Sequence, residues 1–284
     1  MPSIKDYKTP IDINWCPSCG NFGIWKAFVD AAVQEGWNNR NTVLAAGIGC
    51  HGHIVNFVKL TSFEGLHGRA LPLAAGIKMS NHELNVLVFT GDGDLLAEGG
   101  NHFIHAARRN QDITVILHDN AVYGLTTGQT SPTSPKGYRS KSTPQGNPEE
   151  PINPLRLALA SGATFLARSY AGDAKMTAEM IVRANRHKGF AVVQALQPCV
   201  VFNKVYTHAF YRENIYRLGE DYCRTDKSAA FEKTMEWGEK KIPVGIFYEV
   251  REPTYEEQLP QIKEIPLIKQ LLKRDISKLM NKYI

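Results

Sequence analysis

The sequence predicts an α/β fold in which a doubly wound parallel sheet is covered by helices on both faces. Short apolar runs of strand length alternate along the chain with segments of helical pattern, as in β-α-β units. The runs are nearly continuous in valine, leucine and isoleucine, which is typical of strands buried on both faces. The 284 residues are 43% hydrophobic, enough apolar material for the core of one large domain or two small ones.

The alternation assigns the individual elements in chain order. Strands are expected at Asn41–Gly49, Asn85–Gly91, Ile113–Asp119, Thr164–Ser169 and Ala191–Gln197. Helices are expected around Phe22–Gln34, Leu95–Arg109, Leu155–Ala160 and Lys175–Arg186. The segment from Thr126 to Pro154 is rich in Ser, Thr, Pro and Gly. A loop of this length inside a compact domain is more often functional than idle.

The alternation breaks down after Val200 into what we expect to be an irregular polar region. We therefore divide the chain into residues 1–200, which carry the motifs, and a C-terminal extension, residues 201–284. Near its end, apolar residues recur at helical spacing with lysines and arginines between them: Ile268, Leu271, Leu272, Ile276, Leu279 and Met280. This pattern predicts an amphipathic helix that packs on its own domain or docks on a partner subunit.

Composition and charge exclude several classes of protein. The net charge of +5 comes from 33 Lys and Arg against 28 Asp and Glu, scattered until the C-terminus, so no nucleic-acid partner is expected. No signal peptide and no run of 18 apolar residues is present, so no membrane association is expected. We expect a cytoplasmic protein.

Polar side chains follow two of the predicted strands where each strand ends. The stretch Gly91-Asp92-Gly93-Asp94 joins a strand to a helix, and Asn120 follows the next strand, 28 positions after Asp92. Glycines allow a sharp turn and close approach of a ligand, and a helix N-terminus attracts phosphate. In a β-α-β unit Asp92 and Asn120 lie side by side. With a nearby backbone carbonyl, they form part of a ligand shell for Mg²⁺.

The five cysteines are the other informative feature of the sequence. Cys16 and Cys19 form a CxxC pair, and in a reducing cytoplasm a disulfide between them is not expected. Thiolates are soft ligands suited to zinc or to an iron–sulfur cluster. A Cys₃His zinc site can be drawn from the CxxC pair, Cys50 and either His51 or His53.

A set of motifs resembles the β subunit of the 2-oxoacid:ferredoxin oxidoreductases. Gly-Asp-Gly followed by an asparagine after the next strand is similar to the thiamine diphosphate motif. The larger set runs in the family's order from about Trp15 to Asn203: WCPSCGNFGI, GIGCHGHI, HGRALPLAAGIK, GDGDLLAEGGNHFIHAARRN, DNAVYGLTTGQTSPTS and QPCVVFN. The resemblance implies a thiamine diphosphate-binding fold.

The resemblance also implies which residues bind cofactors. A [4Fe–4S] cluster would be held by Cys16, Cys19, Cys50 and Cys199, with Cys223 a bystander. Asp92, Asn120 and the carbonyl of Val122 would hold Mg²⁺. Thiamine diphosphate would be contacted by Ile48, Gly49, Cys50, His51, His67, Gly93, Asp94, Gly124 and Leu125. The roles of His53 and Thr127, where relatives often carry other residues, stay open.

The activity implied is oxidative decarboxylation of a 2-oxoacid, with coenzyme A taking the acyl group and electrons passing through the cluster to ferredoxin. The motif YGLTTGQTSPTS favours 2-oxoglutarate, which gives succinyl-CoA, over pyruvate or a broad 2-oxoacid range. The glutamate that activates thiamine is expected from a partner α subunit, or an α–γ fusion, because only 15 residues precede Cys16. The chain is then a subunit of a heterodimer-type enzyme that is inactive without its partner. Two other functions stay open: a non-redox thiamine diphosphate decarboxylase or carboligase subunit, and a zinc-stapled binding module.

Overall fold

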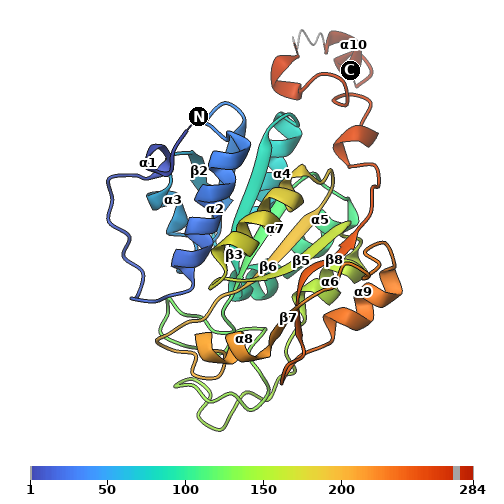
Figure 1. The fold of residues 1–284 in the computed structure, drawn as a ribbon. Coiled ribbons are helices and arrows are strands. Elements are labelled where there is room, and N and C mark those ends of the chain that lie inside the picture. The colour runs from blue at the N-terminus through green and yellow to red at the C-terminus, as the bar shows by residue number, and fades with distance from the viewer. Residues whose placement is uncertain (1, 271–275, 284) are drawn as a thin grey trace.

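The computed structural model describes residues 2–270 and 276–283, which form an α/β fold around one mixed sheet (Figure 1). In the described residues the sheet has eight strands, in the order β2-β1-β3-β4-β6-β5-β8-β7. Their bounds are β1 Thr42–Ala46, β2 Thr61–Glu64, β3 Asn85–Gly91, β4 Thr114–Asp119, β5 Phe165–Tyr170, β6 Ala191–Leu196, β7 Ile215–Arg217 and β8 Ile242–Glu249. The six strands from β2 to β5 in this order are parallel, and the doubly wound prediction is confirmed.

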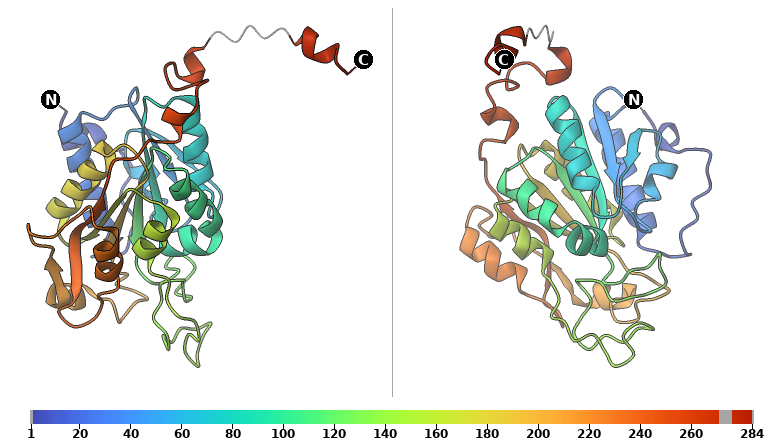
Figure 2. Two further views of the ribbon diagram at one scale, coloured as in Figure 1. Left: turned by 90° about the vertical axis from the view of Figure 1, so that its right-hand side faces the viewer. Right: turned by 180° about the vertical axis from the view of Figure 1, so that it is seen from behind.

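Helices cover both faces of the sheet, as Figures 1 and 2 show. One face packs against α2 (Asn21–Glu35), α3 (Ile54–Phe57) and α7 (Ala174–Arg186). The other packs against α4 (Ala70–Ser80), α5 (Gly100–Arg108), α6 (Pro154–Ser161) and α9 (Lys227–Thr234). The remaining helical pieces are α1 Ile4–Tyr7, η1 Gly93–Glu98, α8 His208–Asn214, η2 Glu256–Gln258, η3 Leu267–Lys269 and α10 Ser277–Met280.

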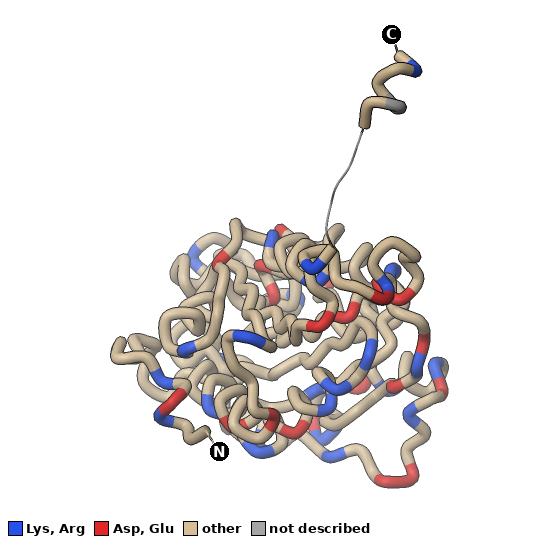
Figure 3. The backbone as a smooth tube through the Cα atoms, turned by 90° about the horizontal axis from the view of Figure 1, so that it is seen from above, with Lys and Arg blue, Asp and Glu red and all other residues tan. Residues whose placement is uncertain are grey.

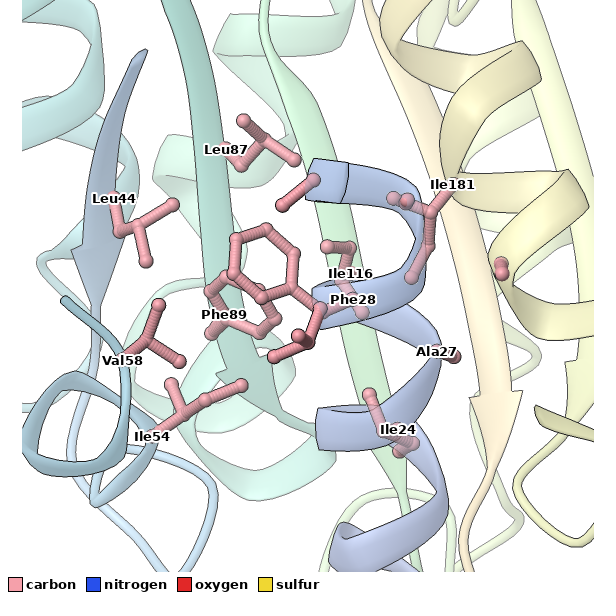
Figure 4. Close-up of a cluster of buried hydrophobic side chains, with 14 of the residues drawn as sticks. Ile24, Ala27, Phe28, Leu44, Ile54, Val58, Leu87, Phe89, Ile116 and Ile181 are labelled. Atoms are coloured by element: carbon pink, nitrogen blue, oxygen red, sulfur yellow. The ribbon is translucent and has the colours of Figure 1, made fainter. Parts of the chain in front are cut away.

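The core between α2 and the sheet is a closely packed apolar cluster (Figure 4). Phe28 on α2 is fully buried, and its ring packs edge-on against Phe89 on β3 with centroids 5.0 Å apart. The Trp37 ring also packs against Phe28, with ring centroids 5.6 Å apart. This cluster fixes α2, and therefore the cysteine pair that precedes it, against the strands.

Replacement of Phe28 by alanine is expected to lower the free energy of unfolding by about 3–5 kcal/mol, because it removes a buried ring and leaves a cavity. Phe63→Ala is the matched control, since that ring is 48% exposed. The control is expected to change stability by no more than about 0.5 kcal/mol. Urea unfolding of both variants measures the difference, and equal losses would contradict this view of the core.

The structure corrects two expectations about the C-terminal residues. The region after Val200 is not irregular throughout, because residues 242–249 form β8, which pairs antiparallel with β5 and parallel with β7. The apolar run IPVGIF is buried in this sheet and was missed because polar residues surround it. The amphipathic helix is interrupted: η3 ends at Lys269, and Gln270 has an extended backbone. Leu271 and Leu272 lie outside the described residues.

Positions of Lys and Arg and of Asp and Glu are distributed along the whole backbone (Figure 3). Several pair between elements, such as Arg186 with Glu35 at 2.7 Å and Arg183 with Glu249 at 2.7 Å. These pairs join α7 to α2 and to β8. None of the helices in the described part of the chain has both the length and the apolar character needed to cross a membrane.

The parallel strands direct their carboxyl ends to one edge, where the loop of residues 120–153 lies (Figure 1). The C-terminal residues leave the domain at the opposite end (Figure 2). The loop is held by its own contacts: the Ser134 hydroxyl donates to Ala121 O at 2.7 Å, and Tyr138 Oη donates to Phe202 O at 2.7 Å. An ordered loop over the strand ends is the usual place for a ligand site in such folds.

Candidate active site at the carboxyl edge of the sheet

The two central strands bring Asp92 and Asn120 together at the carboxyl edge. In the register of the parallel pair, Gly91 of β3 lies opposite His118 of β4. Asp92 follows β3 directly and leads into η1, a π-helix, and Asn120 follows β4 directly. Short π-helical segments occur frequently at functional sites.

A cavity of about 70 Å³ opens at this edge. It is lined by all nine residues that the resemblance assigns to thiamine diphosphate and by the three assigned to Mg²⁺. Tyr123 and Thr126 also line it. We call it the diphosphate cavity. Gly93 is required beside it, because a Cβ there would lie 2.3 Å from the Tyr123 ring.

Asp92 is 2% exposed, and its two carboxylate oxygens have different surroundings. Oδ2 accepts hydrogen bonds from the hydroxyls of Ser131 and Thr133, the latter at 2.7 Å. In the described part of the chain no side-chain donor contacts Oδ1. Burial, together with the nearby Asp119 carboxylate, raises the pKa of Asp92. A buried carboxylate with one free oxygen and no cationic partner fits a cation site.

A strained turn presents the other two predicted magnesium ligands. Ala121 has a positive φ of 54°, unusual for a residue other than glycine. The turn is held by Asn120 Oδ1, which accepts from Val122 N at 3.0 Å and keeps a second lone pair for a ligand. Backbone strain of this kind is commonly kept at functional sites.

Asp94 joins three segments of the diphosphate cavity. Its Oδ1 accepts from Gly68 N at 2.7 Å and Ile48 N at 3.1 Å, and its Oδ2 accepts from the Thr90 hydroxyl at 2.7 Å. Burial raises the pKa of Asp94, but the His51 ring beside it and these donors outweigh burial and lower the pKa to about 2. Because the carboxylate is occupied by donors of the protein, we assign Asp94 to positioning the cavity wall.

Two histidines lie beside this carboxylate, and a third packs against one of them. His67 Nδ1 lies 2.8 Å from Asp94 Oδ1, and its side chain stays 37% exposed on the diphosphate cavity. His51 is buried, and its Nε2 accepts from Gly91 N at 3.1 Å. His118 lies behind His51, and burial lowers its pKa well below the usual value. Of these three histidines, His67 is the one whose side chain is exposed to solvent.

A larger cavity, of about 310 Å³, adjoins the first. It is lined by four of the five cysteines: Cys16, Cys19, Cys50 and Cys199. We call it the thiol cavity. Cys223 is exposed elsewhere, beside Thr225. Burial, together with the neighbouring thiols, raises the pKa of Cys19 to about 12 and of Cys50 to about 11.

The thiols surround the cavity. Within the residues that the structure describes, no group of three or more His, Cys, Asp or Glu side chains is arranged to hold a single metal ion. A cluster of four irons is held by thiolates spread around it. The four cysteine thiols and the cavity between them fit such a cluster.

Local contacts bring the four cysteines together from distant segments. The Cys16–Cys19 turn is closed by Cys19 N donating to Cys16 O at 3.0 Å. Trp15 Nε1 donates to the backbone oxygen of Cys50 at 2.6 Å. A Cβ at Gly124 would lie 3.6 Å from Cys50 Sγ and 3.7 Å from Cys199 Sγ, so both sulfurs flank this glycine.

The two cavities share a wall made of Cys50, Asn120, Gly124 and Leu125. Several residues that line one cavity or the other have no role in the sequence predictions, although each lies within a motif: Trp15, Tyr123, Thr126 and Gln197. Ser131 and Thr133 were also missed. Nothing in sequence spacing shows that the long loop folds back onto Asp92.

Comparison with known proteins defines the class of this protein. Residues 44–195 match the family model "Thiamine pyrophosphate enzyme, C-terminal TPP binding domain". Residues 199–264 match the family model for the C-terminal part of the pyruvate ferredoxin oxidoreductase β subunit. The fold and the site therefore define a thiamine diphosphate enzyme that contributes to a larger complex.

Individual relatives identify the family. The chain is 44% identical over 285 residues to a 2-oxoacid:ferredoxin oxidoreductase β subunit of Sulfolobus sp, covering 94% of this chain and 93% of the relative. It is 45% identical to the corresponding subunit of Saccharolobus solfataricus, covering 87% and 86%. A solved 2-oxoglutarate:ferredoxin oxidoreductase from Magnetococcus marinus matches with a TM-score of 0.92 and 38% identity, covering 100% of this chain and 96% of the other. The chain belongs to the family of 2-oxoacid:ferredoxin oxidoreductase β subunits.

Proposed function

We propose that this protein, as the β subunit of its complex, takes part in coenzyme A-dependent oxidative decarboxylation of a 2-oxoacid, with 2-oxoglutarate as the favoured substrate and succinyl-CoA as the product. Electrons would leave through a [4Fe–4S] cluster to ferredoxin. The observation that carries this proposal is the wall shared by the diphosphate cavity and the thiol cavity. A cofactor in one cavity would lie beside a cluster in the other.

The diphosphate cavity offers three oxygen ligands to Mg²⁺: Asp92 Oδ1, Asn120 Oδ1 and the carbonyl of Val122. Oxygen ligands of this kind suit Mg²⁺, which also binds phosphate oxygens. Gly93 and Gly124 leave the backbone open to a diphosphate, and the partly exposed side chain of His67 lines the same cavity. Thiamine diphosphate, when bound, supplies a carbon nucleophile and takes up the electron pair that decarboxylation releases.

The thiol cavity would hold the cluster through Cys16, Cys19, Cys50 and Cys199. Cys50 belongs to the shared wall, so it would be a cluster ligand that also lines the diphosphate cavity. Since metal binding requires deprotonated thiols, the raised pKa values of Cys19 and Cys50 mean that cluster assembly releases protons.

We assign the activating glutamate to an α subunit. Neither cavity is lined by a glutamate from the described residues. The chain alone is then expected to bind its cofactors without turning over 2-oxoacid. Turnover of a 2-oxoacid by the purified chain in the absence of α would overturn this assignment.

The preference for 2-oxoglutarate rests on the motif YGLTTGQTSPTS and on the solved relative, whose structure has 2-oxoglutarate, coenzyme A and succinyl-CoA bound. The relatives from Sulfolobus sp and Saccharolobus solfataricus are named only for 2-oxoacids. With the complete complex, 2-oxoglutarate is expected to give a higher kcat/KM than pyruvate or 2-oxobutyrate. A higher kcat/KM for pyruvate or 2-oxobutyrate would overturn the assignment of 2-oxoglutarate as the favoured substrate, but not the proposed oxidoreductase activity.

Metal analysis of the anaerobically purified chain tests the redox function directly. We expect about four irons and four sulfides per chain, and an EPR signal after reduction with dithionite. One zinc and no iron would overturn the redox function and leave a non-redox thiamine protein or a zinc-stapled module.

The hydroxyl of Thr133 is expected to hold Asp92 Oδ2 so that Oδ1 faces the ion. Thr133→Val should weaken Mg²⁺-dependent binding of thiamine diphosphate by about tenfold or more, while Thr133→Ser should change it by less than about threefold. Calorimetric titration of the complex measures both values. Thr177→Val, which removes another fully buried hydroxyl that lines neither cavity, is the control for stability. Equal affinity in the valine and serine variants would contradict this role.

A further inference from the structure

Gln197 contacts both predicted metal sites through one side chain. It lies between β6 and Cys199, is 1% exposed and lines the thiol cavity. Its Oε1 accepts from Asn120 Nδ2 at 3.0 Å. Its Nε2 donates to Cys19 Sγ at 3.3 Å and to Pro198 O at 3.3 Å. One amide thus joins a magnesium ligand to a cluster ligand.

The orientation of this amide follows from a chain of hydrogen bonds that begins in the backbone. Val122 N–H donates to Asn120, so the oxygen of the Asn120 side chain faces Val122 and its NH₂ faces Gln197. That NH₂ requires an acceptor, so Gln197 Oε1 faces Asn120. The NH₂ of Gln197 is therefore directed toward Cys19.

A glycine beside the cysteine pair leaves space for this side chain. Gly20 follows Cys19, and a Cβ at Gly20 would lie 2.8 Å from Gln197 Cγ. The backbone on each side is also paired: Gly20 N donates to Pro198 O at 3.2 Å, and Gln197 N donates to Asp119 O at 2.8 Å. Gln197 is held in this position from both sides.

We propose that Gln197 is a positioning residue that raises the reduction potential of the cluster and fixes the Asn120 ligand at the same time. An N–H donated to a ligating sulfur stabilises the more negative, reduced cluster, and such hydrogen bonds are among the factors that set cluster potentials. This role rests on the proposed redox function. Through Gln197, the predicted magnesium ligand Asn120 and the predicted cluster ligand Cys19 belong to one hydrogen-bonded network.

The test compares Gln197→Met with Gln194→Met in the complete enzyme complex. Methionine has similar length and no amide. Gln194 lies in the same region of the chain and is also buried, with 2% of its surface exposed. Its amide contacts Asp119 and Arg168, and it lines neither cofactor cavity. Redox titration followed by EPR gives the potential of the cluster in each variant.

For Gln197→Met we expect the ratio of reduced to oxidised cluster at a fixed potential to fall about tenfold, a shift of about 59 mV toward negative potential for one electron. Gln194→Met is expected to leave the potential unchanged. An unchanged potential in Gln197→Met, or an equal shift in both variants, would overturn the role of Gln197.

A spectroscopic measurement on the unmodified protein protects the test against a variant that does not assemble. In enzyme labelled with ¹⁵N at glutamine side chains, pulsed EPR of the reduced cluster is expected to show a nitrogen coupling that differs from the ¹⁴N sample. No difference would overturn the hydrogen bond to Cys19. If the unmodified protein shows no iron–sulfur signal at all, the redox function itself fails, and this outcome is distinct from the other two.

Discussion

Replacement of Cys50 by serine is expected to remove the cluster and to stop electron transfer to ferredoxin. Cys50 lies on the wall between the two cavities, and its sulfur flanks Gly124 together with that of Cys199. A serine hydroxyl is a hard ligand and a poor substitute for a thiolate in an iron–sulfur site. Iron per chain should therefore fall from about four to below one, and the EPR signal of the reduced cluster should disappear.

The matched control is Cys223→Ser, because Cys223 is exposed and contacts Thr225 rather than either cavity. We expect this variant to keep its iron and its full rate of ferredoxin reduction. Iron, sulfide and the rate with 2-oxoglutarate and coenzyme A are measured on both complexes. A Cys50→Ser complex with normal iron, or equal losses in the two variants, would show that the thiol cavity does not hold the cluster as proposed.

The site residues that are predictable from the sequence are those tied to a local motif. Asp92 and Asn120 each follow an apolar strand. The carboxyl ends of parallel strands lie at the same edge of a sheet, independently of the structure of the loops that follow them. Gly93 belongs to the same motif, but the packing of the Tyr123 ring that requires a glycine there is a tertiary contact.

The partners of these residues depend on tertiary structure and have no local signal. Thr133 reaches Asp92 only because the long loop folds back over the strand ends. Gln197 reaches Cys19, 178 positions earlier in the chain, only because the CxxC turn packs beside the end of β6. Strand β8 was missed for a similar reason: it pairs with β5, which lies far from it in sequence, and polar residues surround it.

The hydrogen bonds at Asp92 separate its role in function from its role in stability. Ser131 and Thr133 donate to Oδ2, and no cation of the described residues pairs with the carboxylate, whose pKa burial raises. A buried carboxylate without a cationic partner is costly to the folded state unless an ion binds it. The same feature that destabilises the chain without metal makes Asp92 a strong ligand for Mg²⁺.

Asp92→Asn is therefore expected to abolish cofactor binding without weakening the fold. The amide oxygen can still accept the two hydroxyls, so the free energy of unfolding without cofactor should be unchanged or higher by about 1 kcal/mol. Mg²⁺-dependent binding of thiamine diphosphate should weaken by more than about 100-fold, because the variant loses the charge of a direct ligand. Urea unfolding and calorimetric titration give the two values, with Asp30→Asn on α2 as the control that removes a carboxylate from the surface. If the variant binds thiamine diphosphate normally, Asp92 is not the magnesium ligand. If it fails to fold, Asp92 is needed for the fold, and the proposed separation of binding from stability is wrong.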